Sequence, residues 1–137
     1  MILLPNLIDG RAIAEQIHQE TAQRVALLVA RGVQPGLVFI RVGEDPASRV
    51  YVGMKEKTST RLGLRSETRV LPVGTTEADL LTLIRSLNAS PLVPGILVHA
   101  PLPQHIREQT VYSTVSPETD VDGFHQVTVG RLMLGCS

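Results

Sequence analysis

The sequence of 137 residues has no tryptophan, a single cysteine and no block of positive charge. Aromatic residues make up only 3% of the chain, so its core must be built from leucine, isoleucine, valine and alanine. The lone Cys136 excludes an internal disulfide framework and is typical of a reducing, cytoplasmic setting. Thirteen basic residues balance thirteen acidic ones, which argues against nucleic acid as a partner held by bulk electrostatics.

Long apolar runs and the common cofactor motifs are also missing. The start of the chain is apolar, but it carries no basic segment and is broken at Pro5 and Asn6, so we predict neither a signal peptide nor a membrane partner. The four histidines do not share metal-ligand spacing on one helix face, so we expect no metal site. No glycine-rich dinucleotide fingerprint, phosphate-binding loop or nucleophile elbow is present.

What the sequence does contain is an alternation of helical and strand patterns. The first helix is predicted from a helically spaced set of residues: Ala14, Ile17, Thr21, Val25 and Leu28. Strands are predicted at residues 36–42, 66–71 and 96–98, of which the first and third are mostly apolar. Further helices are predicted at residues 47–61, from Thr76 to Leu87 and at 107–112, with the remainder an acidic loop and an irregular tail.

This order of elements indicates one wound α/β domain. In such folds the ligand lies outside the carboxyl ends of the parallel strands. We therefore expect the loops after Val42, Leu71 and Val98 to face a common cleft. A response-regulator-like domain would share this pattern, but it needs an acidic cluster after the first strand, where this chain has Arg41 and Gly43.

The helix after the first strand carries the first candidate site residues. Ser48, Tyr51 and Lys55 fall at positions i, i+3 and i+7 and therefore share one face, whereas Val50 and Met54 occupy a stripe that we assign to the core. Tyr51 offers a ring for stacking, and a desolvated Lys55 can act as an acid or base near neutral pH. A tyrosine one turn before a lysine is also common on solvated faces, so the spacing alone leaves that alternative open.

Two later segments add candidates, each with a structural alternative. The strand ending at Val98 runs into HAPLP, where prolines restrict the backbone, and without further context we favour a rigid connection over a binding loop. The segment DVDGF places Asp120 and Asp122 two residues apart before a glycine. It lacks the further oxygen ligands of a calcium loop, so we interpret it as a carboxylate for a heterocycle's N–H groups or as a surface turn.

Taken in order, these segments resemble a known family. The chain reads IDGRAIAEQI, PGLVFIRVGEDPASRVYVGMKEKTSTRLGL, GILVHAPLPQHI and DVDGFHQVTVGRLMLG. It is similar over essentially its whole length to the N-terminal domain of bifunctional methylenetetrahydrofolate dehydrogenase/methenyltetrahydrofolate cyclohydrolases. The resemblance implies a three-layer αβα fold with a small, mainly parallel sheet, the aminoacid-dehydrogenase-like catalytic domain, spanning residues 1–137.

That family oxidises 5,10-methylenetetrahydrofolate with NADP or NAD and hydrolyses the methenyl product to 10-formyltetrahydrofolate. The resemblance implies tetrahydrofolate derivatives as partners. It places Lys55 and Tyr51 among the catalytic residues, with Tyr51 also packing on the folate ring, and assigns Asp122 to the pterin. Ser48 becomes a secondary contact in the same helix. The backbone of residues 98–102, with Val98, Pro101 and Leu102, lines the cleft.

The chain departs from the family pattern in three places. His99 replaces the glutamine that holds the catalytic lysine, which puts His99 among the catalytic residues and predicts weakened or altered cyclohydrolase activity. Thr119 stands where the family has lysine. The sequence stops at Ser137, before the Rossmann domain that binds the nicotinamide cofactor and forms the homodimer. We therefore expect no cofactor in this chain and no dehydrogenase turnover from it. The alternative is a folate-binding or regulatory module without catalysis.

Overall fold

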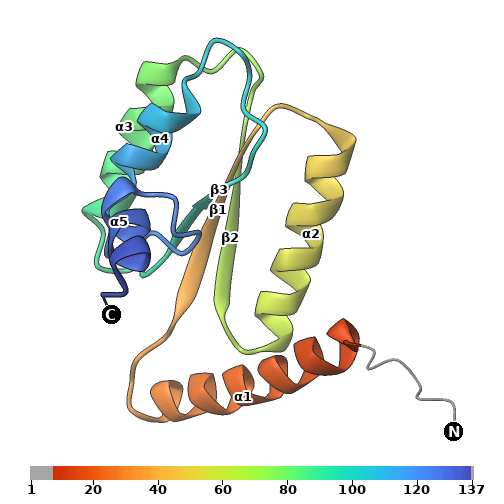
Figure 1. The fold of residues 1–137 in the computed structure, drawn as a ribbon. Coiled ribbons are helices and arrows are strands. Elements are labelled where there is room, and N and C mark those ends of the chain that lie inside the picture. The colour runs from red at the N-terminus through yellow and green to blue at the C-terminus, as the bar shows by residue number, and fades with distance from the viewer. Residues whose placement is uncertain (1–7, 137) are drawn as a thin grey trace, which may run out of the picture.

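A computed structural model describes residues 8–136 of the chain (Figure 1). Its elements in order are α1 (Gly10–Ala30), β1 (Gly36–Val42), α2 (Pro46–Arg61), β2 (Arg65–Leu71), α3 (Glu77–Asn88), β3 (Ile96–Val98), α4 (Glu108–Thr114) and α5 (Gln126–Leu134). All three predicted strands and the first four predicted helices are confirmed. The apolar start with Pro5 and Asn6, on which we judged signal peptides, lies outside the described residues.

The three strands form a parallel sheet in the order β2-β1-β3. In the register, Ile40 of β1 lies opposite Arg69 of β2 and Val98 of β3. The ladder continues one residue past β3, because the His99 N–H donates to the Ile40 carbonyl at 2.8 Å. Since all strands run the same way, their carboxyl ends meet at one edge, which is where the predicted ligand loops begin. The α/β fold class is confirmed.

One face of the sheet carries most of the core. Figure 1 shows α3, α4 and α5 on this side and α2 on the other. Val38, Ile40 and Val42 of β1 pack here against α3, whose Leu80 and Ile84 are fully buried. Helix α3 begins with the predicted cap, because Thr76 Oγ1 accepts the Asp79 N–H at 3.1 Å. This face therefore supplies the rigid base on which the ends of the strands are held.

The face under α2 is thinner. Its buried apolar cluster consists of Phe39, Leu97 and Val52. The prediction that Val50 and Met54 serve the core is wrong, because their side chains are 60% and 59% exposed. Helix α2 instead turns small residues toward the sheet, with Ser48, Val52 and Ser59 buried. Small side chains allow a close approach to the strands, and the larger apolar residues are left on the outer side.

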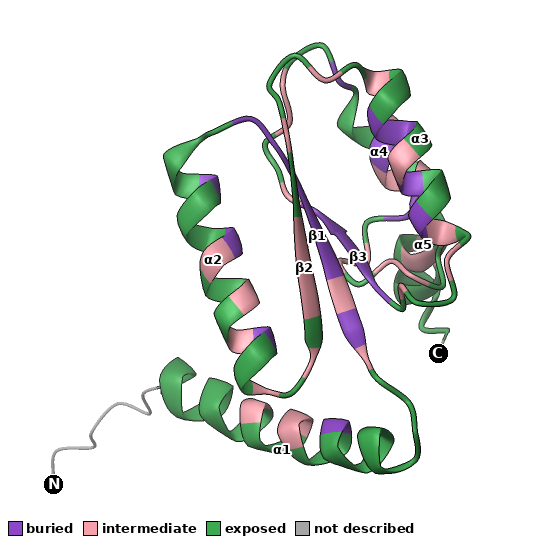
Figure 2. Cartoon of the chain, turned by 180° about the vertical axis from the view of Figure 1, so that it is seen from behind, coloured by how far each residue is buried: buried purple, intermediate pink, exposed green. Residues whose placement is uncertain are grey.

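Helix α1 lies across the amino-terminal end of the sheet, and most of its surface is exposed (Figure 2). Among its 21 residues Val25 alone is buried, while Ile17 of the predicted stripe is 55% exposed. Polar contacts attach it, including an Arg61 Nη2···His18 Nδ1 hydrogen bond at 2.8 Å. The predicted helix is confirmed, but within residues 8–136 its apolar stripe is mostly uncovered.

Helix α5 is an element that the sequence analysis missed. It begins at a cap formed by a histidine, since His125 Nδ1 accepts the Val127 N–H at 3.0 Å. It ends at Gly135, whose φ of 67° is left-handed. The prediction of an irregular tail is wrong here. Val127 and Val129 are β-branched, and Gly130 follows them, so helix propensity is low and the local pattern is weak.

Strand β2 lies at an edge of the sheet and is rich in charge. Arg65, Glu67 and Arg69 alternate along it, and Arg69 Nε contacts Glu67 Oε1 at 2.6 Å. Charged side chains of this kind are typical of strands whose outer edge faces solvent.

No helix within residues 8–136 is long and apolar enough to cross a membrane.

Candidate functional site

The loop after β1 is built to start α2. Gly43 takes a φ of 87°, which favours glycine, and Pro46 occupies the first turn of the helix. The Asp45 carboxylate accepts the Ser48 N–H at 2.7 Å. This backbone hydrogen bond, joined by one from the Ser48 side chain, lowers the pKa of Asp45. Ser48 is 4% exposed, so its polar groups serve the helix cap, and its role as a secondary substrate contact stays a prediction.

Tyr51 and Lys55 lie one helical turn apart on α2. Both side chains are exposed, and Tyr51 is 59% accessible. Residues four apart on a helix face the same way, so the predicted shared face of these two is reproduced. An aromatic ring and an ammonium group are thus presented together, close to the edge where β1 and β3 end.

His99 stands directly after β3 at that same edge. Its side chain is half-buried. Burial is the main cause that lowers the pKa of His99, and the positive charges of Lys55 and Arg41 lower it further. Asp122 and Asp45 act in the opposite direction. Because the lowering causes prevail, His99 is neutral at neutral pH and does not repel the Lys55 ammonium there.

The two aspartates of DVDGF do different things. Asp120 accepts three backbone N–H groups, from Gly123 at 3.0 Å, Phe124 at 3.3 Å and His125 at 2.9 Å. It therefore holds the turn together. Asp122 is half-buried, and burial raises its pKa, while the charges of Lys55 and His99 lower it. The structural interpretation of this segment is thus confirmed for Asp120, and the role of Asp122 as a carboxylate for a heterocycle stays a prediction.

Three segments far apart in the sequence therefore converge. Lys55 of α2, His99 after β3 and Asp122 before α5 each lie within electrostatic reach of the others. Tyr51 borders this group from the next turn of α2. Together they combine a ring, an ammonium, an imidazole and a carboxylate, which suits a flat heterocycle bearing N–H groups.

Residues 98–102 contribute mainly through their backbone. The Val98 side chain is 4% exposed and belongs to the core on the α3 face, so it does not point toward Lys55. Pro101 is exposed and follows a cis peptide bond. Leu102 packs on the core, and its N–H donates to Glu108 Oε1 at 3.1 Å. The assignment of these residues to substrate binding stays a prediction.

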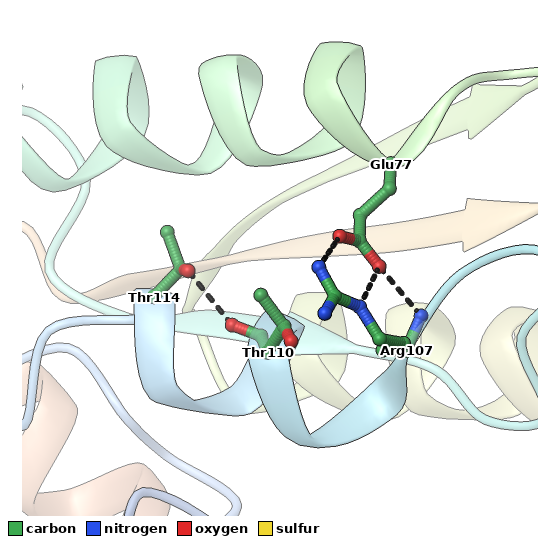
Figure 3. A network of polar contacts seen from close by, with 4 residues as sticks. All are labelled: Glu77, Arg107, Thr110 and Thr114. Carbon is green, nitrogen blue, oxygen red and sulfur yellow. Dashed lines mark hydrogen bonds and ion pairs between the residues drawn. The ribbon is translucent and has the colours of Figure 1, made fainter.

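An ion pair fixes the segment that follows. Glu77, at the start of α3, accepts three hydrogen bonds from Arg107, at the start of α4 (Figure 3). These contacts hold the pKa of Glu77 down at about 2. His105 adds a hydrogen bond to the Thr75 carbonyl at 2.8 Å. The loop from Pro101 is thus held at one end by β3 and at the other by α3. No local sequence pattern predicted this contact between Glu77 and Arg107.

Arg41 is a second residue that the sequence analysis passed over. Its side chain is nearly buried, and Nη1 donates to the Gly43 carbonyl at 2.8 Å. Glu44 lies 3.6 Å from the same nitrogen but is 74% exposed. A signal existed, because an arginine inside the otherwise apolar strand GLVFIRV needs a reason to be buried.

Two cavities lie away from this group of residues. One of about 590 Å³ is found at the amino ends of the strands, between Gly36, Arg65 and Pro94. Another of about 390 Å³ is lined by Tyr112 and Phe124, whose rings pack 5.1 Å apart. Tyr51, Lys55 and His99 line neither of these two cavities. Within residues 8–136 no group of three His, Cys, Asp or Glu side chains could hold a metal ion.

The fold is that of an α/β domain with a small parallel sheet, and comparison with known families identifies which one. Residues 8–122 match the family described as tetrahydrofolate dehydrogenase/cyclohydrolase, catalytic domain. The chain therefore belongs to this family, as its sequence motifs had indicated.

Individual relatives agree. The chain is 51% identical over 132 residues to the bifunctional protein FolD of Geotalea uraniireducens, covering 96% of this chain and 47% of that protein. Among solved structures, it is similar to the bifunctional FolD enzyme of Campylobacter jejuni, with 38% identity, a TM-score of 0.92 and coverage of 94% and 46% of the two chains. A 5,10-methylenetetrahydrofolate dehydrogenase from the silkworm gives 37% identity and a TM-score of 0.94, with 97% and 46% covered. The chain thus spans about half the length of the relatives that it matches.

Proposed function

We propose that this chain is the folate-binding catalytic domain of an enzyme of one-carbon metabolism. In this proposal, the whole protein oxidises 5,10-methylenetetrahydrofolate to the methenyl form and hydrolyses that to 10-formyltetrahydrofolate. The observation that carries it is the convergence of Lys55, His99 and Asp122, bordered by Tyr51, at the carboxyl edge of the sheet. The alternative, a folate-binding module without catalysis, is favoured by one observation, the imidazole of His99 beside Lys55.

Substrate binding follows from the chemistry of two side chains. The exposed Tyr51 ring offers a flat apolar surface against which an aromatic part of the folate can stack. The half-buried Asp122 carboxylate can accept hydrogen bonds from the N–H and amino groups of the pterin. Partial burial strengthens such hydrogen bonds, because fewer water molecules compete for the carboxylate oxygens. Asp120, which holds the turn, keeps Asp122 in place.

Hydrolysis requires water to add to the methenyl carbon between N5 and N10, after which the bond to N5 breaks and the formyl group stays on N10. One proton is released overall. We assign Lys55 to orienting this water and moving its proton, since it stands one turn from Tyr51 and within electrostatic reach of Asp122. A neutral His99 can accept a hydrogen bond from the lysine and so orient it.

The nicotinamide cofactor, which supplies hydride acceptance when bound, does not fit the residues of this chain. A dinucleotide needs a helix N-terminus free to receive its pyrophosphate. At the carboxyl edge, the N-terminus of α2 is capped by the Asp45 carboxylate, and α3 carries Glu77 and Asp79 in its first turn. These carboxylates repel phosphate.

Cofactor binding and dimer formation are therefore assigned, in this proposal, to the second half that the longer relatives possess. One relative from Trypanosoma brucei is solved in complex with NADP, and one from Saccharomyces cerevisiae is NAD-dependent. The cofactor of the whole protein is accordingly NADP or NAD. A cytoplasmic location, where reduced folates and an unpaired Cys136 are compatible, completes the proposal.

The test combines binding with hydrolysis. Tetrahydrofolate is titrated into the chain by calorimetry, and hydrolysis of methenyltetrahydrofolate is followed by the loss of its absorbance above the uncatalysed rate. Lys55→Met should abolish the catalysed rate while leaving binding within a few fold. Lys57→Met, which removes an equally exposed lysine from the same helix, is the matched control and should change neither. Binding without catalysis in the unaltered chain would favour the module, and no binding would refute both.

A further inference from the structure

We propose that Arg41 is a positioning residue of the candidate site. It holds the loop after β1 and places a permanent positive charge beside His99. As a result, His99 stays uncharged and can accept a hydrogen bond from Lys55. The pairing of Arg41 with His99 is a property of this structure that can be examined without any substrate. Its meaning for catalysis rests on the proposed function.

The register of the sheet brings the two residues together. Ile40 lies opposite Val98, and the next step of the ladder joins the His99 N–H to the Ile40 carbonyl. Side chains alternate between the faces of a strand. Phe39 and Leu97 pack on the face under α2, so residues 41 and 99, two further along, project on that same face. Arg41 and His99 are therefore lateral neighbours beneath the helix that carries Lys55.

The charge of Arg41 is unusually placed. Its side chain is 6% exposed, yet the carboxylate that it meets, Glu44, is three-quarters exposed and lies 3.6 Å away. A solvated carboxylate compensates a buried guanidinium only weakly. The hydrogen bond to the Gly43 carbonyl orients the guanidinium without neutralising it. Arg41 thus retains most of its positive charge toward its neighbours on the sheet.

The charged groups that face His99 are two positive and two negative side chains. Lys55 from α2 and Arg41 from β1 oppose a proton on the imidazole, and Asp122 and Asp45 from the two loops favour it. Of these four, Arg41 is the one whose charge does not titrate at any accessible pH. It therefore biases His99 toward the neutral form regardless of how the lysine and the carboxylates respond to bound substrate.

This arrangement bears on the replacement of the glutamine that the family resemblance implies at position 99. An amide offers a donor and an acceptor from one end, whereas a neutral imidazole offers its acceptor and donor from different ring nitrogens. With Arg41 alongside, the His99 imidazole supplies the hydrogen-bond acceptor and the Arg41 guanidinium supplies hydrogen-bond donors. The two side chains together thus replace the acceptor and donor of the single glutamine amide, and His99 stays uncharged.

The experiment follows the ring resonances of the histidines by NMR during a pH titration of the whole chain. The sequence holds four histidines, and loss of one signal in His99→Gln assigns the relevant one. Arg41→Met removes the charge and keeps much of the length, so the His99 pKa should rise by about half a unit, the size expected of one charge several ångströms away in partly hydrated protein. Arg41→Lys keeps the charge and should leave the His99 pKa close to that of the unaltered chain.

Two controls keep the outcome decisive. Arg69→Met removes an exposed arginine from the opposite face of the sheet and should not move the His99 signal. Glu44→Gln, at an exposed position, removes the carboxylate beside Arg41 and should leave the His99 pKa nearly unchanged, because a solvated carboxylate compensates the guanidinium only weakly. An unchanged His99 titration in Arg41→Met would overturn the proposal, and if Arg41→Met does not fold, the polar replacement Arg41→Gln, which also removes the charge, decides in its place. Failure of folate binding would refute the proposed function and leave this result standing.

Discussion

Glu77 and Arg107 are joined by three hydrogen bonds: Nη2 to Oε1 at 2.6 Å, and the backbone N–H and Nε to Oε2 at 2.8 and 3.1 Å. The contact links the first turn of α3 to the residue that precedes α4. It therefore fastens the loop from Pro101 to the most strongly packed helix of the domain. Because one partner is largely exposed, its effect on stability is moderated by solvent.

The first prediction concerns this contact and pH. The pKa of Glu77 lies at about 2 in the folded chain and at about 4.5 ordinarily. The stabilisation by a carboxylate with a lowered pKa is complete above the ordinary value and is lost as pH falls toward the folded one. Glu77→Gln should therefore lower the Tm by a few degrees at pH 7, and the difference should shrink between about pH 4.5 and 2. Glu118→Gln, an exposed carboxylate, is the control, and a pH-independent difference would contradict the assignment.

The second prediction separates the two aspartates of DVDGF. Asp120→Ala leaves three backbone N–H groups without their acceptor, so it should cost about 2 kcal/mol in the free energy of unfolding. Asp122→Asn should leave stability nearly unchanged and weaken tetrahydrofolate binding by tenfold or more. Urea denaturation and calorimetric titration measure the two effects. If Asp122→Asn proved the more destabilising, the division of roles would be wrong.

The third prediction concerns His99 and hydrolysis. Burial and the Lys55 charge lower the pKa of His99, so the imidazole becomes protonated only on the acid side of its ordinary value. There it repels the Lys55 ammonium, whereas at higher pH it is neutral and can accept a hydrogen bond. His99→Gln should therefore raise the rate of methenyltetrahydrofolate hydrolysis several-fold at low pH and little at high pH. A pH profile of initial rates tests this, and no change in rate at any pH would sink the idea.

The fourth prediction contrasts the two sides of the sheet. Ile84 is fully buried in α3, and Ile84→Ala should cost about 2–5 kcal/mol in the free energy of unfolding. Ile17 belongs to the predicted apolar stripe of α1 but is 55% exposed, and Ile17→Ala should cost no more than about 0.5 kcal/mol. Chemical denaturation of both variants gives the comparison. Equal costs would mean that α1 packs more closely than the structure shows.

Much of the fold was predictable because its local signals are strong. Asp45 before Pro46 announces the start of α2, and Gly32 and Gly63 have the left-handed backbone expected just beyond a helix end. The three short strands could be placed to within one residue. The outward position of Val50 and Met54 could not, because it depends on the small residues that α2 turns toward the sheet.

The residue types of the candidate site could be predicted from the sequence, but the contacts between those residues could not. Tyr51 and Lys55 follow from helical spacing, and Asp122 from the resemblance. The separate task of Asp120 required the hydrogen bonds of the turn to be seen. Arg41 became relevant only once the register between β1 and β3 placed it beside His99, since 58 positions of sequence separate the two and no local pattern joins them.

The alternating charges of β2 have a consequence for how this domain behaves in concentrated solution. Arg65, Glu67 and Arg69 line a strand whose outer edge pairs with no other strand among residues 8–136. Approach of another copy's strand would bring like charges together and strip water from all three. The least buried strand of the sheet thus protects the domain from aggregation. Replacing Arg65, Glu67 and Arg69 together by apolar residues would make that edge a site at which fibrils can start.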